Sequence, residues 1–220
     1  MRAYTFLAVP MAASSNGPLV QFPKRPRQRV FLAQGDIDGA CGHHSIAMAL
    51  IAFGVIDRLH LVAYRLRRDE KGDLVRALRQ TYFDGIDADE IVALLRPFSP
   101  VIAATAFTLS SKKTIAVIQQ AIASNDLVIA GIEGRGGRLS HWVLIVGLEL
   151  HGKGTQKQLR ALLLLDASEA MPTVSCWNAR IEIDSTRKAR HRCIGIDGST
   201  INVEFNDLIV IGHNSRLNSR

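Results

Sequence analysis

Three widely separated residues have side chains that can act together as a nucleophile, a base and an orienting carboxylate. Cys41 lies where a polar loop, residues 35–39, meets the apolar segment CGHHSIAMALIAFG. A helix that begins at Cys41 points the positive end of its dipole at the thiol and stabilises the thiolate, which is the reactive form. Gly39 and Gly42 bracket the cysteine and permit close approach of a substrate backbone. Cys41 is therefore predicted to be a nucleophile.

The predicted base and orienter lie on two consecutive strands. His141 stands near the start of an apolar strand, and Asp166 stands near the end of the next one. In an antiparallel hairpin the start of one strand lies beside the end of its partner, so these two side chains are expected to be neighbours. A carboxylate there accepts a hydrogen bond from the imidazole and fixes its tautomer.

Further residues complete a predicted site for acyl transfer. Gln34 precedes Cys41 by seven residues, and its amide is expected to join the Cys41 backbone N–H in an oxyanion hole. His44, at i+3 from Cys41, shares the same helix face. Ser140 and Trp142 flank the base. With Gly39 and Gly42, these three residues are predicted to line the substrate site. The chemistry requires neither a metal nor a cofactor, and neither is predicted.

The elements that must position these residues follow from apolar periodicity and from turn residues. Asp87 fits an N-cap, residues 134–138 form a Gly-rich turn, and residues 151–157 form a hairpin loop. Helices are expected at 41–54, 57–68, 73–81, 88–97 and 112–124, and strands at 29–34, 101–109, 126–133, 140–150, 158–168, 174–183 and 201–212. Most helices precede most strands, which favours an α+β fold with an N-terminal helical part packed on a C-terminal antiparallel β-sheet.

The predicted organisation is one domain with short flanking segments. Residues 13–29 are rich in Ser, Asn, Gly, Pro and Arg, which is typical of an exposed linker. The chain is accordingly divided into an N-terminal arm or linker at 1–28, a hydrolase domain at 29–212 and a C-terminal tail at 213–220.

Three motifs carry a resemblance to a known family. They are Q-x6-C-G-x-x-S from Gln34, G-x-L-S-H-W-V-L-I-V-G around His141, and L-L-D-A at Asp166. Together they resemble the papain-like cysteine peptidase superfamily, in particular its bacterial C39-like members. The resemblance covers about residues 29–210 and implies a papain-like fold, with Cys41 as nucleophile, His141 as base, Asp166 as orienter and Gln34 as oxyanion donor. Gln34 is one residue further from the cysteine than the family pattern, and Ala167 replaces a frequent proline.

The net charge and the distribution of charged residues limit which kinds of partner are expected. The chain has 27 Lys and Arg against 20 Asp and Glu, a formal net charge of +7. Such a surplus suits an acidic partner or simply keeps the protein in solution. The basic runs lack the interleaved aromatics of a nucleic-acid stacking platform, so nucleic acid is not an expected partner. No run approaches the roughly 18 apolar residues that cross a bilayer, so no membrane span is predicted.

Cysteine usage suggests the compartment. Cys41, Cys176 and Cys193 are an odd number at wide spacings, which is not a disulfide framework. A reducing cytoplasm is therefore predicted. The first residues have weak secretory features, a single Arg and a short apolar stretch broken by Pro10, so secretion stays open.

The predicted function is a bacterial thiol protease that cleaves a peptide or isopeptide bond in a protein or peptide substrate. A transamidase or deamidase would use the same residues. Two other classes stay open: a non-enzymatic interaction module, and a metal-binding protein. The possible metal ligands match no known zinc spacing; they are Cys41, His43 or His44, Cys176, His191 and Cys193. The sequence leaves the substrate's identity and the oligomeric state open.

Overall fold

The structure, a computed structural model, describes most of the chain. The described residues are 2–23, 25–35, 39–62, 68–109, 111–134, 140–153, 156–184 and 190–214. Residues 135–138 of the predicted Gly-rich turn, the middle of the loop before Cys41 and nearly all of the predicted tail lie outside these ranges.

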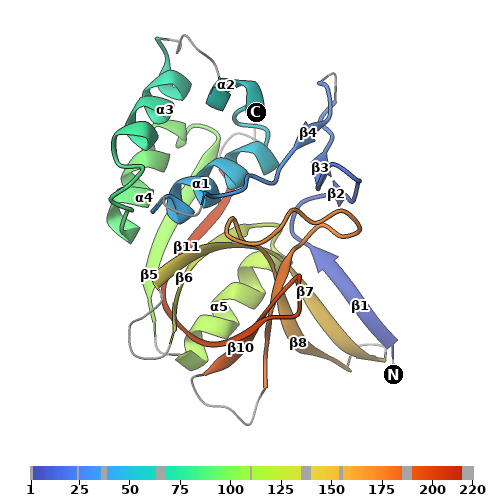
Figure 1. Ribbon diagram of the computed structural model, residues 1–220. Coiled ribbons are helices and arrows are strands. Elements are labelled where there is room, and N and C mark those ends of the chain that lie inside the picture. Colours follow the sequence, from blue (N-terminus) through green and yellow to red (C-terminus); the bar gives the residue numbers. More distant parts are fainter. Residues whose placement is uncertain are drawn as a thin grey trace.

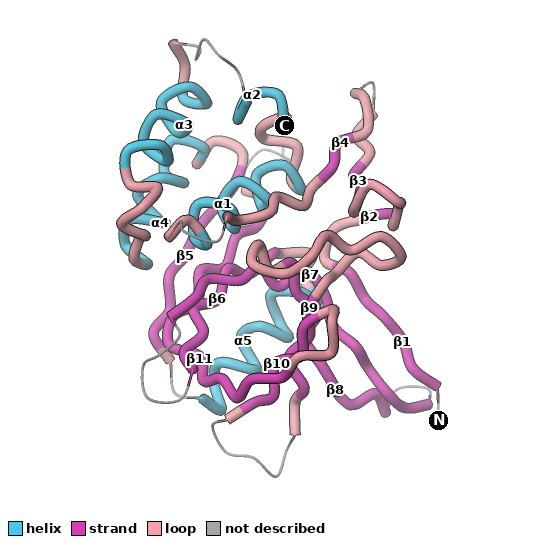
Figure 2. Tube along the Cα trace, in the orientation of Figure 1, coloured by secondary structure: helices cyan, strands magenta, loops and turns pink. Residues whose placement is uncertain are grey.

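Most strands belong to one antiparallel sheet that closes on itself (Figures 1 and 2). The closed part consists, in spatial order, of β7 (Ser140–Lys153), β6 (Leu127–Gly134), β11 (Thr200–His213), β10 (His191–Gly195), β9 (Ala179–Glu182) and β8 (Gln156–Leu165), and β8 pairs with β7 to complete the ring. Two strands extend this barrel. β1 (Arg2–Leu7) pairs with the second half of β7, and β5 (Ile102–Thr108) pairs with β11.

The helices cover parts of this barrel. They are α1 (Cys41–Ala52), α2 (Arg58–Val62), α3 (Glu70–Gln80), α4 (Ala88–Leu95), the 3-10 turn η1 (Arg96–Phe98) and α5 (Ser111–Ala123). α1 packs on β6 and β7, α4 on β5 and β11, and α5 on β6, β7 and β11. Ahead of α1, a small antiparallel sheet is formed by β2 (Met11–Ala12), β3 (Leu19–Val20) and β4 (Gln28–Arg29).

The prediction of a papain-like helical part packed on a C-terminal sheet is wrong. The protein is mainly a six-stranded barrel with extra strands, and 27% of the described residues are helical. One barrel-extending strand, β1, comes from the very start of the chain, while α5 lies in the second half. Closure depends on β9 and β10, which are four and five residues long. Such short strands give little periodic signal, and their pairing joins distant segments.

Several local predictions can be compared with the structure directly. A helix does begin at Cys41, and Asp87 does cap α4: its side chain accepts a hydrogen bond from the Glu90 N–H at 2.9 Å. The predicted strand at 29–34 is limited to the end of β4, and β7 and β8 continue into the predicted 151–157 loop. Within the predicted arm at 1–28, β1 pairs with β7 along its whole length.

The core explains why the central elements are apolar throughout. In α1, all positions but His44 are buried, because the helix lies between the barrel and the other helices. β6 reads LVIAGIEG and is buried on both faces, since α1 and α5 both contact it. Within the described ranges, no helix is both long and apolar enough to cross a membrane.

Candidate active site

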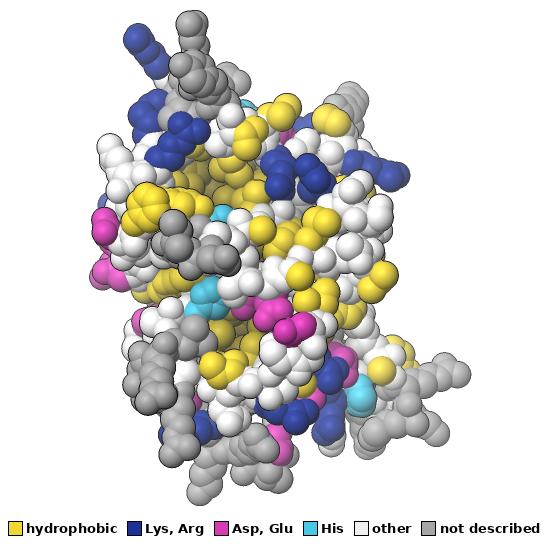
Figure 3. Space-filling model, viewed as in Figure 1, with side chains coloured by type: hydrophobic (Ala, Val, Ile, Leu, Met, Phe, Trp, Pro, Cys, Tyr) yellow, Lys and Arg dark blue, Asp and Glu magenta, His cyan; other side chains and the backbone are white. Residues whose placement is uncertain are grey.

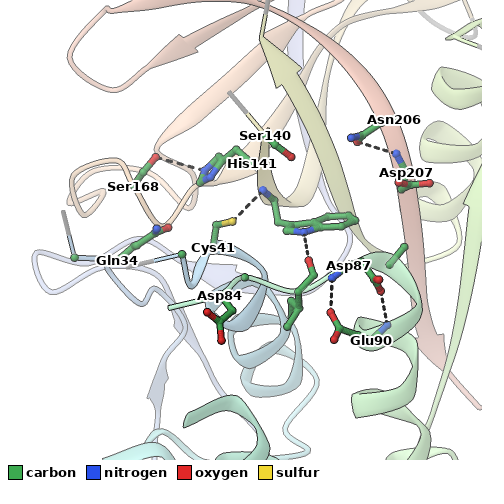
Figure 4. A pocket seen from close by; sticks show the side chains of 16 residues that line it. Gln34, Cys41, Asp84, Asp87, Glu90, Ser140, His141, Ser168, Asn206 and Asp207 are labelled. Atoms are coloured by element: carbon green, nitrogen blue, oxygen red, sulfur yellow. Dashed lines mark hydrogen bonds between the residues drawn. The ribbon is translucent and has the colours of Figure 1, made fainter. Parts of the chain in front are cut away.

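Cys41 is the first residue of α1, as predicted from the loop-to-helix transition. Its N-cap residue, Ala40, has no side chain that could cap the helix, so no side chain of the N-cap competes for the first-turn amides. The side chain is only 8% exposed. The backbone N–H of Trp142 donates to Cys41 Sγ at 3.4 Å (Figure 4). This surrounding of N–H groups favours a negative charge on sulfur.

His141 and Asp166 meet where the β7–β8 hairpin register predicts. Near the open end of the hairpin, Leu144 of β7 pairs with Leu165 of β8, so Asp166 is brought beside His141. His141 Nε2 donates to Asp166 Oδ1 at 2.7 Å. Both are well buried, with 8% and 6% exposure. The bond occupies Nε2 and leaves Nδ1 for the thiol.

The side chain of His141 also interacts with the thiol of Cys41, and the two groups shift each other's titration. Burial raises the pKa of Cys41, but the bond to His141, the Trp142 N–H and the imidazolium charge outweigh it and lower this pKa overall. Burial likewise lowers the pKa of His141, but the bonds to Asp166 and Cys41 raise it to about 10. Both shifts favour the form of the pair in which a thiolate faces an imidazolium.

Asp166 is held by a residue that the sequence did not single out. Ser168 donates to Asp166 Oδ1 through its backbone N–H at 2.9 Å and its hydroxyl at 2.7 Å. The same hydroxyl lies 3.4 Å from His141 Nε2 (Figure 4). Burial raises the pKa of Asp166, but the bonds from His141 and Ser168 lower it overall. The carboxylate thus stays charged opposite the imidazolium.

A second unpredicted residue, Asn178, fixes the backbone at Asp166. Its Oδ1 accepts from the Asp166 N–H at 2.8 Å, and its Nδ2 donates to the carbonyls of Asp166 at 2.8 Å and Ala170 at 3.1 Å. The side chain is 2% exposed. No local pattern marks this residue, because its partners lie 8 and 12 positions earlier in the chain.

Replacing Asn178 with Ala is expected to lower the free energy of unfolding by about 3 kcal/mol, because the buried N–H and C=O of Asp166 lose their partner. Urea denaturation measures the change. The matched control is Asn202→Ala on the exposed part of β11, which should stay within about 0.5 kcal/mol. Equal losses in the two variants would contradict this role for Asn178.

The reactive pair opens into a cleft of about 950 Å³. Gln34, Gly39, Ser140 and Trp142, all predicted to belong to the site, line it together with Cys41, His141 and Ser168. The Gln34 N–H donates to the Ala167 carbonyl at 2.7 Å, which ties the segment between β4 and α1 to the turn after Asp166. Figure 4 shows the Gln34 side chain beside Cys41 on the same wall of the cleft.

Two predicted substrate residues, Gly42 and His44, lie elsewhere. A Cβ atom on Gly42 would lie 2.7 Å from Ile86 Cγ1, so this glycine allows Ile86, rather than a substrate, to approach α1. His44 Nδ1 donates to the Ala40 carbonyl at 2.8 Å, and the ring lines a separate, mainly apolar pocket of about 310 Å³. His44 does follow Cys41 by three positions on α1, but Cys41 at the helix end lines the cleft, whereas His44 lines this separate pocket.

The other cysteines differ chemically from Cys41. Burial raises the pKa of Cys176, and burial together with the charge of Asp166 raises that of Cys193 to about 12. Among the described residues, no group of three or more His, Cys, Asp or Glu side chains could hold a metal ion. The ligands proposed for a metal site are therefore not assembled into one in that part of the chain.

Comparison with known proteins adds no name to this site. The chain matches no protein-family model, and no curated protein matches it. Its function is therefore inferred from the site itself, namely a cysteine, a histidine and an aspartate joined in series at the edge of a cleft.

Proposed function

We propose that the protein is a cysteine peptidase that cleaves a peptide or isopeptide bond through an acyl-enzyme on Cys41. The observation that carries the proposal is the position of His141, which donates to Asp166 at 2.7 Å and interacts with the thiol of Cys41. A nucleophile paired with a base, which is oriented by a third group, is the arrangement that activates a weak nucleophile. The adjoining cleft gives an extended peptide access to the sulfur.

The proposed reaction has two steps. The Cys41 thiolate attacks the carbonyl carbon, and the His141 imidazolium gives its proton to the leaving amine as the C–N bond breaks. A thioester to Cys41 remains. Water then attacks the thioester while His141 takes one of its protons, and breaking the C–S bond releases a carboxylic acid and restores the pair.

The developing oxyanion needs donors at the start of α1. The backbone N–H of Cys41 belongs to the first turn of the helix, where N–H groups have no partner within the helix. We assign it the first donor role and give the second to the Gln34 side chain, which lines the same cleft. Preorganised donors of this kind are worth about 100-fold or more in rate.

The resemblance of the surrounding motifs to those of C39-like peptidases supports the same roles for Gln34, Cys41, His141 and Asp166. We propose a protein or peptide as the substrate, because the cleft beside Cys41 has a volume of about 950 Å³, which has room for a peptide segment. We also propose a bacterial, cytoplasmic protein. The three cysteines are all free, and a thiolate is best preserved where the environment is reducing.

A peptide library digested in water enriched in oxygen-18 tests the proposal. New peptide ends should appear, each with oxygen-18 in its carboxylate, since water resolves the thioester. Cys41→Ala should give none, while Cys193→Ala, which removes the other strongly shifted thiol, should still cleave. Conversion of glutamine without chain cleavage would instead identify a deamidase, and amine incorporation a transamidase. Equal products from wild type and Cys41→Ala would reject the peptidase.

A further inference from the structure

The cleft beside Cys41 is acidic although the protein is basic. Its walls include four carboxylates, from Asp84, Asp87, Glu90 and Asp207. The described residues that line it include no Lys or Arg. The chain as a whole has a formal net charge of +7. Figure 3 shows Lys and Arg mainly towards the top and bottom of the viewed face, with Asp and Glu mainly across its middle.

Three of these carboxylates are held at defined positions on two walls. Asp87 and Glu90 form the capping box of α4, in which each side chain accepts from the other residue's backbone N–H, at 2.9 and 2.8 Å. Asp207, on β11, accepts from the Thr108 hydroxyl at 2.8 Å. Figure 4 shows Asp207 across from Asp87 and Glu90, at the end of the cleft away from Gln34. These bonds leave the negative charges in place.

An aromatic side chain, Trp142, connects the reactive pair with this acidic end. Its indole Nε1–H donates to the Ile86 carbonyl at 2.8 Å, which fixes the ring. A Cβ atom on Gly42 would lie 3.1 Å from Cδ1 of the indole, and one on Gly131 would lie 3.2 Å from Cζ3 and against the Asn206 amide oxygen. The ring therefore extends from the start of α1 to the neighbour of Asp207.

An indole beside several carboxylates is an arrangement that binds organic cations, because the ring face and the carboxylates both attract positive charge. In the described part of the chain the acids form no group that could hold a metal ion, which favours a larger cation. A Lys or Arg side chain has the length to lie along Trp142 and reach the carboxylates with its charged end.

Building on the peptidase function proposed above, we propose that the substrate carries a Lys or Arg residue close to the scissile bond and that the cleft formed by Trp142, Asp84, Asp87, Glu90 and Asp207 binds it. The chain's net positive charge suggested an acidic target, but the charge that a substrate meets next to Cys41 is negative. Local charge rather than net charge selects the substrate.

Charged thiol reagents test the inference without a known substrate. The full chain is treated with methanethiosulfonates that carry a trimethylammonium, a sulfonate or a neutral methyl group, and modification at each cysteine is followed by mass spectrometry. The Cys41 thiolate displaces methanesulfinate and forms a mixed disulfide, so each rate reports the local concentration of that reagent. The quantity compared is the ratio of the cationic to the anionic rate.

The variant Asp84→Asn/Asp87→Asn/Glu90→Gln/Asp207→Asn keeps one acceptor oxygen at each position and retains residues suited to a capping box. It should lower the cation-to-anion ratio at Cys41 about tenfold. Asp84→Asn/Asp207→Asn, which leaves the capping box untouched, should lower it in the same direction by a smaller factor. Asp73→Asn on α3, a residue outside the cleft, is the control for removal of a charge.

An unchanged ratio in both cleft variants, or an equal fall in Asp73→Asn, would overturn the inference. A different result would contradict the peptidase proposal itself. In that case the neutral reagent would modify Cys41 no faster than it modifies Cys176 and Cys193. That outcome would show that Cys41 is not an activated nucleophile. Loss of the charge preference alone would contradict only the proposal that the substrate is basic.

Discussion

Replacing His141 with Ala is expected to slow alkylation of Cys41 by iodoacetamide at pH 6 by about 100-fold or more. The thiol is buried, and burial alone raises its pKa, so the low value depends on the bond to His141 and on the imidazolium charge. Without the imidazole, only the backbone N–H donors are left to offset the effect of burial on the pKa of Cys41. The thiolate fraction falls tenfold for each unit by which this pKa rises. Mass spectrometry of the labelled site measures the rate.

The pH dependence of the alkylation rate shows in which direction His141 shifts the pKa of Cys41. In the wild type the alkylation rate should rise with pH through the lowered pKa of Cys41, below the ordinary thiol value. In His141→Ala the rise should shift to alkaline pH. For peptide cleavage the profile should be bell-shaped, with a falling limb near pH 10 where the imidazolium loses its proton.

The matched control is His151→Ala, which removes a half-buried histidine paired with Glu149 away from the cleft. Its Cys41 profile should match that of the wild type. Coincident profiles for His141→Ala and the wild type would mean that the two side chains are not coupled.

Asp166→Asn is expected to slow alkylation of Cys41 at pH 6 by about tenfold or more while the fold is retained. Asn keeps the oxygen that accepts from His141 and Ser168 but removes the charge. Because the bond to Asp166 is the largest contribution that raises the pKa of His141, the imidazolium becomes harder to form and the thiolate loses its counter-charge. Alkylation rates across pH, together with circular dichroism, measure both parts.

The same variant should lower the free energy of unfolding by about 2 kcal/mol at pH 7, since a buried charged hydrogen bond is weakened. The pKa of Asp166 is lowered in the folded state, so its contribution is present above the unfolded value of about 3.9 and is lost as pH falls through the folded pKa. The stability difference from the wild type should therefore narrow in acid.

Asp197→Asn, on an exposed turn, is the control for alkylation and should leave the rate at Cys41 unchanged. A slowing equal to that in Asp166→Asn would contradict the role of Asp166.

Local signals account for the parts of the site that the sequence predicted. The change from a polar loop to an apolar run located the start of α1 at Cys41, and the β7–β8 register brought His141 and Asp166 to one end of a hairpin. The N-cap at Asp87 follows from the preference of short polar side chains for helix starts. Each of these features depends on neighbours in sequence or on a single hairpin.

The remainder depends on contacts between distant segments. Barrel closure requires β10 to pair with β9 and β11. The sequences of the short strands β9 and β10 do not indicate which strands they pair with. Asn178 acts on Asp166 across a twelve-residue turn, and Trp142 bonds to Ile86 across the cleft. His44 was misplaced because helical spacing tells which face a residue shares but not which cavity that face meets at a helix end.

The central claim is that Cys41 exists as a thiolate activated by His141. The most direct test is alkylation of the wild-type protein by iodoacetamide from pH 4 to pH 10, with the rate at all three cysteines read from the same digest. The account predicts that Cys41 reacts with an apparent pKa below the free-thiol value of about 8.5, while Cys176 and Cys193 stay nearly unreactive throughout. Slow alkylation of Cys41, at a rate and with a pH dependence like those of the other two, would contradict it.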